Sequence, residues 1–287
     1  SITNLKNTNM GYTYSLSALF EKSFYFGLDL AASYTFGHSK SVYDGTSSVA
    51  YSNWKYNYAV DSNNPGLAYS MFDIPHRVMV SVGYRTPRYA KGFMATTVSL
   101  VYNGYVGQRY SLTMNESYYD AEKKKTVYID YNGDGWGGNS LLYIPTEDEL
   151  QKMDFKTEED RRKFDEWIEG DSYAKKHRGA YAMRNSNSAP WENRVDLHVA
   201  QDIFVLKDRG SKFQVTFDVT NFANMLNKKW GTTYTAAYNV MPLQVIGSKK
   251  GEDGNYTNTY AYNSRNTITK NDVLSRWHAQ IGFKYIF

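Results

Sequence analysis

The clearest candidate for chemistry is a short acidic loop, Asp130-x-Asn132-x-Asp134-Gly135. Side-chain oxygens at every second residue are the ligands that calcium takes from such loops, and the glycine falls where the chain has to turn sharply. The twelfth position is Leu141, so the glutamate that usually binds the ion through both oxygens is missing. The same residues also form an Asx-rich hairpin tip readily. The sequence therefore leaves two interpretations for Asp130, Asn132 and Asp134, a calcium site or a turn without metal.

The other reactive side chains form no catalytic pattern. The chain has no cysteine, which excludes thiol catalysis, disulfides and cysteine-ligated zinc. Its five histidines show no pair at zinc spacing: His38, His76, His177, His198 and His278. His198 and His278 fall on polar strand faces, where a hydrogen-bonded structural histidine is the simpler interpretation. We find no nucleophile motif and no phosphate-binding loop, and we expect no enzyme.

Aromatic side chains in the long connections are candidates for contacts with a ligand. They include Tyr51, Trp54, Tyr56, Tyr58 and Trp136. Flat rings of this kind can stack on sugars or peptides, but more often they hold long loops to one another. The sequence alone does not decide between these roles, so it assigns no substrate site.

The elements that carry these loops are predicted to be strands with one apolar and one polar face. In residues 276–287, every second residue from Trp277 to Phe287 is apolar or aromatic, and the residues between them are mostly polar. The same alternation predicts strands at 11–20, 24–37, 77–84, 93–105, 194–206 and 212–222. Asp29 falls on the polar face of the second strand, where a watery lumen would accept its charge.

The connections between these strands alternate in length. Short turns are predicted at 21–23, 86–92 and 207–211, and long connections at 38–75, 106–190 and 224–272. In an antiparallel sheet this pattern places every long connection at one end and the C-terminus at the other, as in outer-membrane barrels.

The longest connection also contains helix signals. Capping motifs beginning at Thr146 and Thr157 predict two short helices. Phe164, Trp167 and Ile168 give the second helix an apolar stripe, which we expect to pack on its own loop.

Composition agrees with a membrane protein built from strands. The mean hydropathy of −0.61 and the lack of any apolar run near about 18 residues exclude a helical membrane protein. The 27 tyrosines suit interfacial girdles, and a dispersed net charge of +4 gives no basis for nucleic-acid binding. We therefore expect an all-β chain, a transmembrane antiparallel β-barrel segment of about seven strands. Because an open sheet in lipid would expose unpaired edges, the remaining wall must come from elsewhere in the same polypeptide or from another chain.

Several short patches, taken as a set, resemble one family. They are DYNGDG at 130–135, NSLLYIP at 139–145, KHRG at 176–179 with AYA at 180–182 and RN at 184–185, APWEN at 189–193, DVTNF at 218–222, LN at 226–227 with WG at 230–231, and the end at 276–287. They resemble the C-terminal part of the TonB-dependent outer-membrane receptors of Bacteroidetes-type bacteria, in the Oar-like branch with a carboxypeptidase-regulatory-like N-terminal extension. The resemblance covers most of residues 76–287.

This resemblance implies an outer-membrane barrel of about 22 strands with a plugged lumen. Residues 1–287 would be the C-terminal part of that barrel, with long loops extracellular, one of them containing short helices, and with the C-terminus periplasmic. The implied function is active uptake of a large solute, such as an oligosaccharide, a peptide or a metal chelate. The plug and the segment that contacts TonB would precede Ser1.

The partners implied are the remaining strands and plug, TonB, outer-membrane lipid and lipopolysaccharide, and a surface lipoprotein, with no nucleic acid. Two other interpretations stay open. One is a barrel that does not transport, an adhesin or an assembly or secretion component that binds a macromolecule through its loops. The other is a soluble β-rich carbohydrate-binding module.

Overall fold

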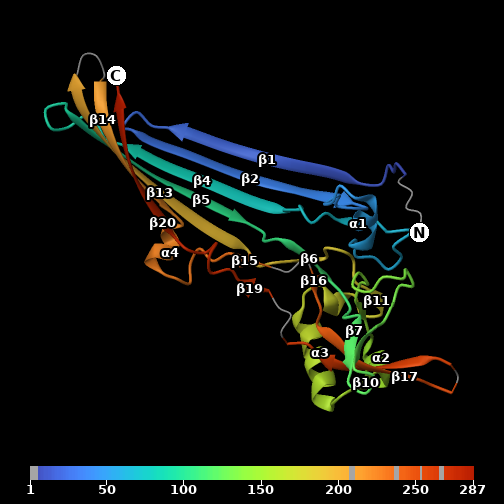
Figure 1. The fold of residues 1–287 in the computed structure, drawn as a ribbon. Coiled ribbons are helices and arrows are strands. Elements are labelled where there is room, and N and C mark those ends of the chain that lie inside the picture. The colour runs from blue at the N-terminus through green and yellow to red at the C-terminus, as the bar shows by residue number, and fades with distance from the viewer. Residues whose placement is uncertain (1–5, 207–210, 236–238, 253, 265–267) are drawn as a thin grey trace.

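One antiparallel sheet of long strands dominates the molecule (Figure 1). The structure is a computed structural model that describes residues 6–206, 211–235, 239–252, 254–264 and 268–287. Seven long strands pair in chain order: β1 (Tyr12–Ser23), β2 (Leu28–Ser41), β4 (His76–Arg85), β5 (Met94–Tyr105), β13 (Glu192–Leu206), β14 (Ser211–Thr220) and β20 (His278–Ile286). The two-residue β3 (Ala68–Tyr69) extends the sheet at the end of β2. The prediction of an all-β, antiparallel architecture is confirmed.

The sheet is open across the part of the chain that is described. There, the long strand β1 pairs only with β2, and β20 pairs only with β14. Among these residues no helix is both long and apolar enough to cross a membrane.

The strand register gathers the apolar residues on one face of the sheet. Leu30, Val82, Leu100, Leu197 and Val219 stand directly opposite one another in a row that crosses five strands. Because side chains alternate along each strand, the residues between them form a second, polar face, on which Asp29 lies opposite Gly83. The predicted separation into two faces is therefore present across the sheet.

Much of the apolar face is open to its surroundings. Leu16 is 72% exposed, Ile281 63% and Phe283 81%. A face of this size in a soluble protein would be buried against a second layer. In hydrocarbon these exposed apolar side chains would be covered by lipid, so no second protein layer would be needed.

The two short turns that the structure describes, between β1 and β2 and between β4 and β5, lie at one end of the sheet, close to the C-terminus, and the long connections lie at the other (Figure 1). The predicted alternation of connections is therefore correct. The turn predicted at 21–23 is wrong, because these residues continue β1 and the chain turns at 24–27 instead. Gly27 adopts a φ of +97° there, and a Cβ at this position would lie 2.2 Å from the carbonyl oxygen of Arg85. The turn thus depends on glycine, and the second strand begins at Leu28 instead of residue 24.

Other boundaries shift by a few residues. The final strand was predicted at 276–287 and spans His278–Ile286, and the strand predicted at 194–206 begins earlier, at Glu192. The strand predicted at 212–222 is β14, Ser211–Thr220. Most of the turn predicted at 207–211 lies outside the described residues.

The long connections contain their own helices and strands. The first holds α1 (Ala50–Lys55) as well as β3. The second holds β6 (Arg109–Leu112), β7 (Ser117–Asp120), β8 (Lys125–Tyr128), β9 (Tyr143–Ile144), α2 (Glu147–Lys152), β10 (Asp154–Phe155), α3 (Glu158–Gly170), the 3₁₀ helix η1 (Ala174–Lys176), β11 (Ala180–Tyr181) and β12 (Asn187–Ser188). The third holds α4 (Phe222–Leu226), β15 (Tyr234–Thr235), β16 (Asn239–Val240), β17 (Leu243–Lys250), β18 (Tyr256–Tyr262) and β19 (Thr269–Lys270).

Both predicted helix caps are present. The Thr146 hydroxyl accepts a hydrogen bond from the backbone N–H of Glu149 at 3.3 Å, and the Glu149 carboxylate accepts one from the backbone N–H of Thr146 at 2.9 Å. The Thr157 hydroxyl accepts one from the backbone N–H of Asp160 at 3.1 Å. Each cap satisfies N–H groups that the first turn of a helix cannot pair.

The second and third connections share one hydrophobic core, which we call the loop core. It consists of Tyr110, Leu112, Met114, Leu142, Ile144, Leu150, Phe155, Phe164, Ile168, Ala174, Ala182, Val240 and Leu243. The helix α3 packs on its own connection, as we expected, and it also packs on β18 from the third connection. Sequence periodicity reveals the apolar stripe of a helix and does not reveal which distant segment covers it.

Truncating the loop core should loosen the loops and leave the sheet intact. Phe164 is completely buried, so Phe164→Ala should cost about 3–5 kcal/mol in the stability of the loop region. Pulse proteolysis of the purified protein would measure this as cleavage within residues 110–182 and 240–262 at lower urea. Glu166→Ala, on an exposed position of the same helix, is the control. Equal resistance of both variants would contradict the assignment of a shared core.

Candidate ligand-binding loops

The acidic loop Asp130–Gly135 forms a closed set of hydrogen bonds. The Asp130 carboxylate accepts from the backbone N–H groups of Asp134 at 3.1 Å and Gly135 at 2.8 Å. The Asp134 carboxylate accepts from the Ser62 hydroxyl at 2.6 Å and from the side-chain amide of Asn139 at 2.7 Å. Asx turns also form within the loop, because the side-chain oxygens of Asn132 and Asp134 accept from the backbone N–H groups two residues further on, at 3.4 and 2.7 Å. The bond from Ser62 joins this loop to the first connection.

The same atoms bear on the calcium prediction. The amide nitrogen of Asn132 donates to Asn139 at 2.9 Å, so Asn132 also takes part in the network. Within the described ranges, no group of three or more carboxylates and histidines is arranged to hold a metal ion. Calcium binding by Asp130, Asn132 and Asp134 stays a prediction, since two carboxylates and one amide lie together there.

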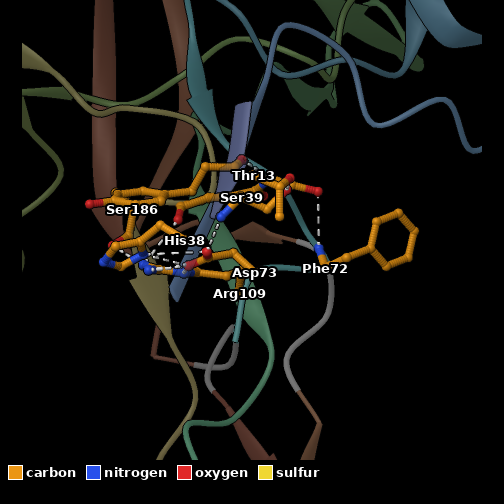
Figure 2. Close-up of polar contacts among 10 residues, drawn as sticks. Thr13, His38, Ser39, Phe72, Asp73, Arg109 and Ser186 are labelled. Carbon is orange, nitrogen blue, oxygen red and sulfur yellow. Dashed lines mark hydrogen bonds and ion pairs between the residues drawn. The ribbon is translucent and has the colours of Figure 1, made fainter. Parts of the chain in front are cut away.

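An ion pair at the base of the loops ties the first connection to the second. The Asp73 carboxylate accepts hydrogen bonds from Nε and Nη2 of Arg109 at 3.0 and 2.6 Å, and the Asp73 side chain is completely buried (Figure 2). The same carboxylate accepts from the backbone N–H of Ser39 at 2.6 Å, and His38 Nδ1 lies 3.3 Å from both of its oxygens. Both Arg109 nitrogens donate to the same oxygen, Oδ2, and hydrogen bonds between two charged groups are stronger than those between neutral groups. This cluster fixes the path of the second connection where it leaves β5 and enters β6.

A second buried arginine, Arg184, also joins the first and second connections. Arg184 donates to the carbonyl oxygen of Ser41 and to Oδ1 of Asn57, each at 2.5 Å, and lies 3.7 Å from the carboxylate of Asp44. Its burial lowers the pKa of the guanidinium from the usual value, an effect that Asp44 opposes. Asn185, with a φ of +55°, donates from its side-chain amide to the carbonyl oxygen of Tyr69 at 2.8 Å.

Two cavities of similar size lie among the connections. The first, of about 340 Å³, lies between the first and second connections and is lined by Asp44, Gly45, Thr46, Ser52, Asn53, Tyr56, Asn57, Tyr58, Met71, Arg184 and Asn185. The second, of about 350 Å³, is lined by residues of all three connections, including Val60, Tyr131, Tyr143, Glu149, Tyr181 and Tyr260. Both volumes fall within the range of roughly 300–1,000 Å³ that small-molecule sites occupy.

The aromatic residues singled out from the sequence gather near the first cavity. Tyr51 and Trp54 stack with ring centroids 5.7 Å apart, and Tyr56 meets Trp136 edge-on at 6.4 Å. The Lys55 ammonium lies 3.3 Å from the centre of the Trp136 ring. The contacts of Tyr56 and Lys55 with Trp136 join the first and second connections, which is one of the two roles considered for these rings, whereas the stack of Tyr51 on Trp54 lies within the first connection. Tyr56 and Tyr58 also line the cavity itself.

The polar face of the sheet carries an ionic cluster that sequence analysis did not find. Asp202 is almost completely buried, and its carboxylate accepts from Arg85 at 2.7 Å, Lys212 at 2.7 Å and Gln214 at 2.8 Å. These four residues lie on three strands. Alternation placed each of them on the polar face, but it gave no information on their meeting.

The two strand histidines lie where the alternation placed them. His198 Nδ1 is 2.5 Å from the carboxylate of Asp218, its direct neighbour on β14, so this histidine has a structural partner as expected. His278 is opposite Thr220 on the same polar face.

One buried carboxylate in the loops lacks a full set of partners. Glu116 Oε2 accepts from the backbone N–H of Gly138 and, at 3.5 Å, from that of Ser140. Within the described part of the chain, its other oxygen has no hydrogen-bond partner. Burial raises the pKa of Glu116, and the neighbouring charge of Asp134 adds to this effect.

Comparison with known protein families agrees with this architecture. The model of a family described as an outer membrane beta-barrel domain matches residues 1–276. The chain belongs to this family. Its place is therefore the bacterial outer membrane, and the exposed apolar face of the sheet is the face that meets lipid. No curated protein and no solved structure matches the chain.

Removing the charge of Asp73 should loosen the attachment of the first connection to the end of the sheet, where Asp73 contacts Arg109 and Ser39. Asp73→Asn leaves Arg109 buried without a counter-charge, which costs about 3–5 kcal/mol. Hydrogen exchange across residues 69–76 should accelerate accordingly. Glu159→Gln is the matched control, because its partner Arg162 is on the surface and an exposed pair contributes only about 0.2–1 kcal/mol. Unchanged exchange in Asp73→Asn would show that the pair does not hold this connection in place.

The buried carboxyl of Glu116 should make the stability of the loops depend on pH. Because its pKa is raised in the folded state, the folded loops hold a proton that the unfolded chain has released, so this contribution to stability falls as pH rises from the usual glutamate pKa towards the raised one. Glu116→Gln should therefore raise the melting temperature of the loops more at pH 7.5 than at pH 5. Tryptophan fluorescence during heating measures the difference, and an equal shift at both pH values would refute the assignment.

Proposed function

We propose that this chain is the C-terminal part of an active outer-membrane transporter that takes up a large solute with its long loops. Its long connections form an ordered unit at one end of the sheet, with a shared core, two buried arginine clusters and two cavities. That organisation is the observation that carries the proposal. A loop that only shields a barrel needs no core and no cavity, whereas a loop that selects a solute needs both.

In this proposal the wall is completed by further strands, to a total of about 22, and a plug fills the lumen. The polar face of the sheet, with its cluster around Asp202, lines the path that the plug occupies. The long loops are extracellular and the C-terminus is periplasmic. TonB drives uptake through the plug-bearing part of the transporter, and a surface lipoprotein, lipopolysaccharide and membrane lipid are its neighbours. The chain carries out no catalysis.

Uptake by whole cells tests this proposal. Cells with and without the protein are given a defined mixture of neutral oligosaccharides, peptides and iron chelates, and depletion of each solute is followed by mass spectrometry. We expect one class to be depleted only by cells that have the protein, and depletion to stop when the proton-motive force is collapsed. Binding that survives this collapse without any accumulation would instead support a barrel that does not transport, such as an adhesin.

A further inference from the structure

The second cavity has a mostly apolar lining, to which all three long connections contribute. Its aliphatic and thioether side chains include Val60, Met114, Leu141, Met153 and Leu243. Met114 and Leu243 are members of the loop core, and Met153 packs against it, so the floor of the cavity is the outer surface of that core. A lining of this kind favours an apolar ligand, because their contact removes apolar surface of both from water.

Tyrosine rings complete the wall of this cavity. Four of them line it: Tyr131, Tyr143, Tyr181 and Tyr260. Tyr143 and Tyr181 meet edge-on with their ring centroids 5.1 Å apart, and Tyr181 is 52% exposed, so its ring is open to an entering ligand. Aromatic rings attract one another in edge-on and offset arrangements, and methionine sulfur makes favourable contacts with ring edges. Four rings and two thioethers therefore favour an aromatic ligand over an aliphatic one of the same size.

The polar groups of the lining already have partners or lie out of reach. Glu149 is the only charged residue among the described lining residues, and its carboxylate accepts hydrogen bonds from the backbone N–H of Thr146 and from the hydroxyl of Tyr143, each at 2.9 Å. The side-chain amide of Asn132 donates at 2.9 Å within the hydrogen-bond network of the acidic loop. The hydroxyl of Ser140 is buried beneath the surface, where a ligand cannot touch it. A charged ligand would lose its hydration without gaining a free partner, so the occupant that fits is uncharged.

We infer that the second cavity binds an uncharged aromatic ring carried by the solute that the loops select. The ring enters beside Tyr181 and packs between the tyrosine wall and the loop core. Such a ring can belong to an aromatic residue of a peptide or to a small aromatic compound. The inference rests on the proposed function and deepens it, because it names the chemical class of the solute. Binding in detergent needs no energy coupling, so the inference and the transporter can fail separately.

The test is titration of the detergent-purified, full-length protein with N-acetyl-phenylalaninamide, followed by saturation-transfer NMR with protein-free micelles as the blank. N-acetyl-cyclohexylalaninamide is the matched probe, because its ring is saturated, similar in size and more apolar. We expect the aromatic probe to bind about two- to tenfold more tightly, the effect of ring–ring contacts beyond apolar burial. Equal affinities, tighter binding of the saturated ring, or no binding of the aromatic probe would overturn the inference.

Two further probes test the charge and identify the source of the ring. N-acetyl-4-carboxyphenylalaninamide adds a carboxylate to the same ring, and we expect it to bind at least about tenfold more weakly, because the lining offers that charge no free partner. Comparable affinity would overturn the requirement for an uncharged ring. Benzyl alcohol carries the ring without peptide groups. Weaker binding than that of N-acetyl-phenylalaninamide would assign the ring to a peptide, and equal binding would assign it to a small aromatic compound.

Variants locate the site. Tyr181→Leu removes one ring of the wall and should weaken binding of N-acetyl-phenylalaninamide about two- to tenfold. Val60→Arg, at a 45% exposed position of the lining, places a charged side chain in the cavity and should abolish binding. Tyr119→Leu is the matched control, because Tyr119 is 65% exposed on β7 and lies outside the described lining of both cavities. Unchanged affinity in either Tyr181→Leu or Val60→Arg would overturn the inference. Binding of the ring without energy-dependent uptake would contradict the transporter alone.

Discussion

The structure depends on one constraint, which is that a broad apolar face of a single sheet has no protein layer on it. Water would penalise exposure of Leu16, Ile281 and Phe283 in proportion to their area. In hydrocarbon, exposure of the same apolar area carries no free-energy penalty. The penalty falls instead on unpaired backbone groups, so the N–H and C=O groups of the strands must all form hydrogen bonds. The long, in-register ladders between neighbouring strands meet that demand inside the sheet. The sheet is therefore stabilised by hydrogen bonds between its strands in a hydrocarbon environment. The hydrophobic core that a soluble protein would form is found in the loops instead.

Packing reappears in the loops. There the chain is in water again, and it buries Phe164, Ile168 and Leu112 as a soluble domain would. Ion pairs at the boundary between the two environments serve a different purpose. Asp73 with Arg109 and Arg184 with Asp44 fix the direction in which the loops leave the sheet. Buried pairs of this kind contribute little net stability compared with apolar residues, but they tolerate only one geometry, which suits a binding surface that has to hold its shape.

The sequence was informative wherever a local rule governs the outcome. Period-two alternation located the seven long strands and assigned Asp29 and His198 to the correct face. The capping residues Thr146 and Thr157 located two helices. Sequence analysis misplaced the first turn. The aromatic residues at 24–26 resemble the start of a strand, and the positive φ of Gly27 produces no periodic signal in the sequence.

Contacts between distant residues were beyond such rules. Asp73 and Arg109 are separated by 36 residues, and Arg184 and Asn57 by 127. Neither pair has a spacing that a helix or a strand would produce. The patches around Arg184 and Asn185 attracted attention only through family resemblance, which indicated that they matter without saying what they touch. The second cavity, which residues of all three connections line, is visible only once those connections have been placed.

The loop core has a consequence for the order in which the molecule assembles. Its members come from residues 110–182 and 240–243, and β13 and β14 lie between these two segments. The core therefore cannot close until both strands have been threaded and the third connection has been carried to the same side of the membrane. Contacts of such long sequence separation form slowly. The surface of the protein would then mature after its wall, and a barrel already inserted in the membrane would for a time carry unfinished loops.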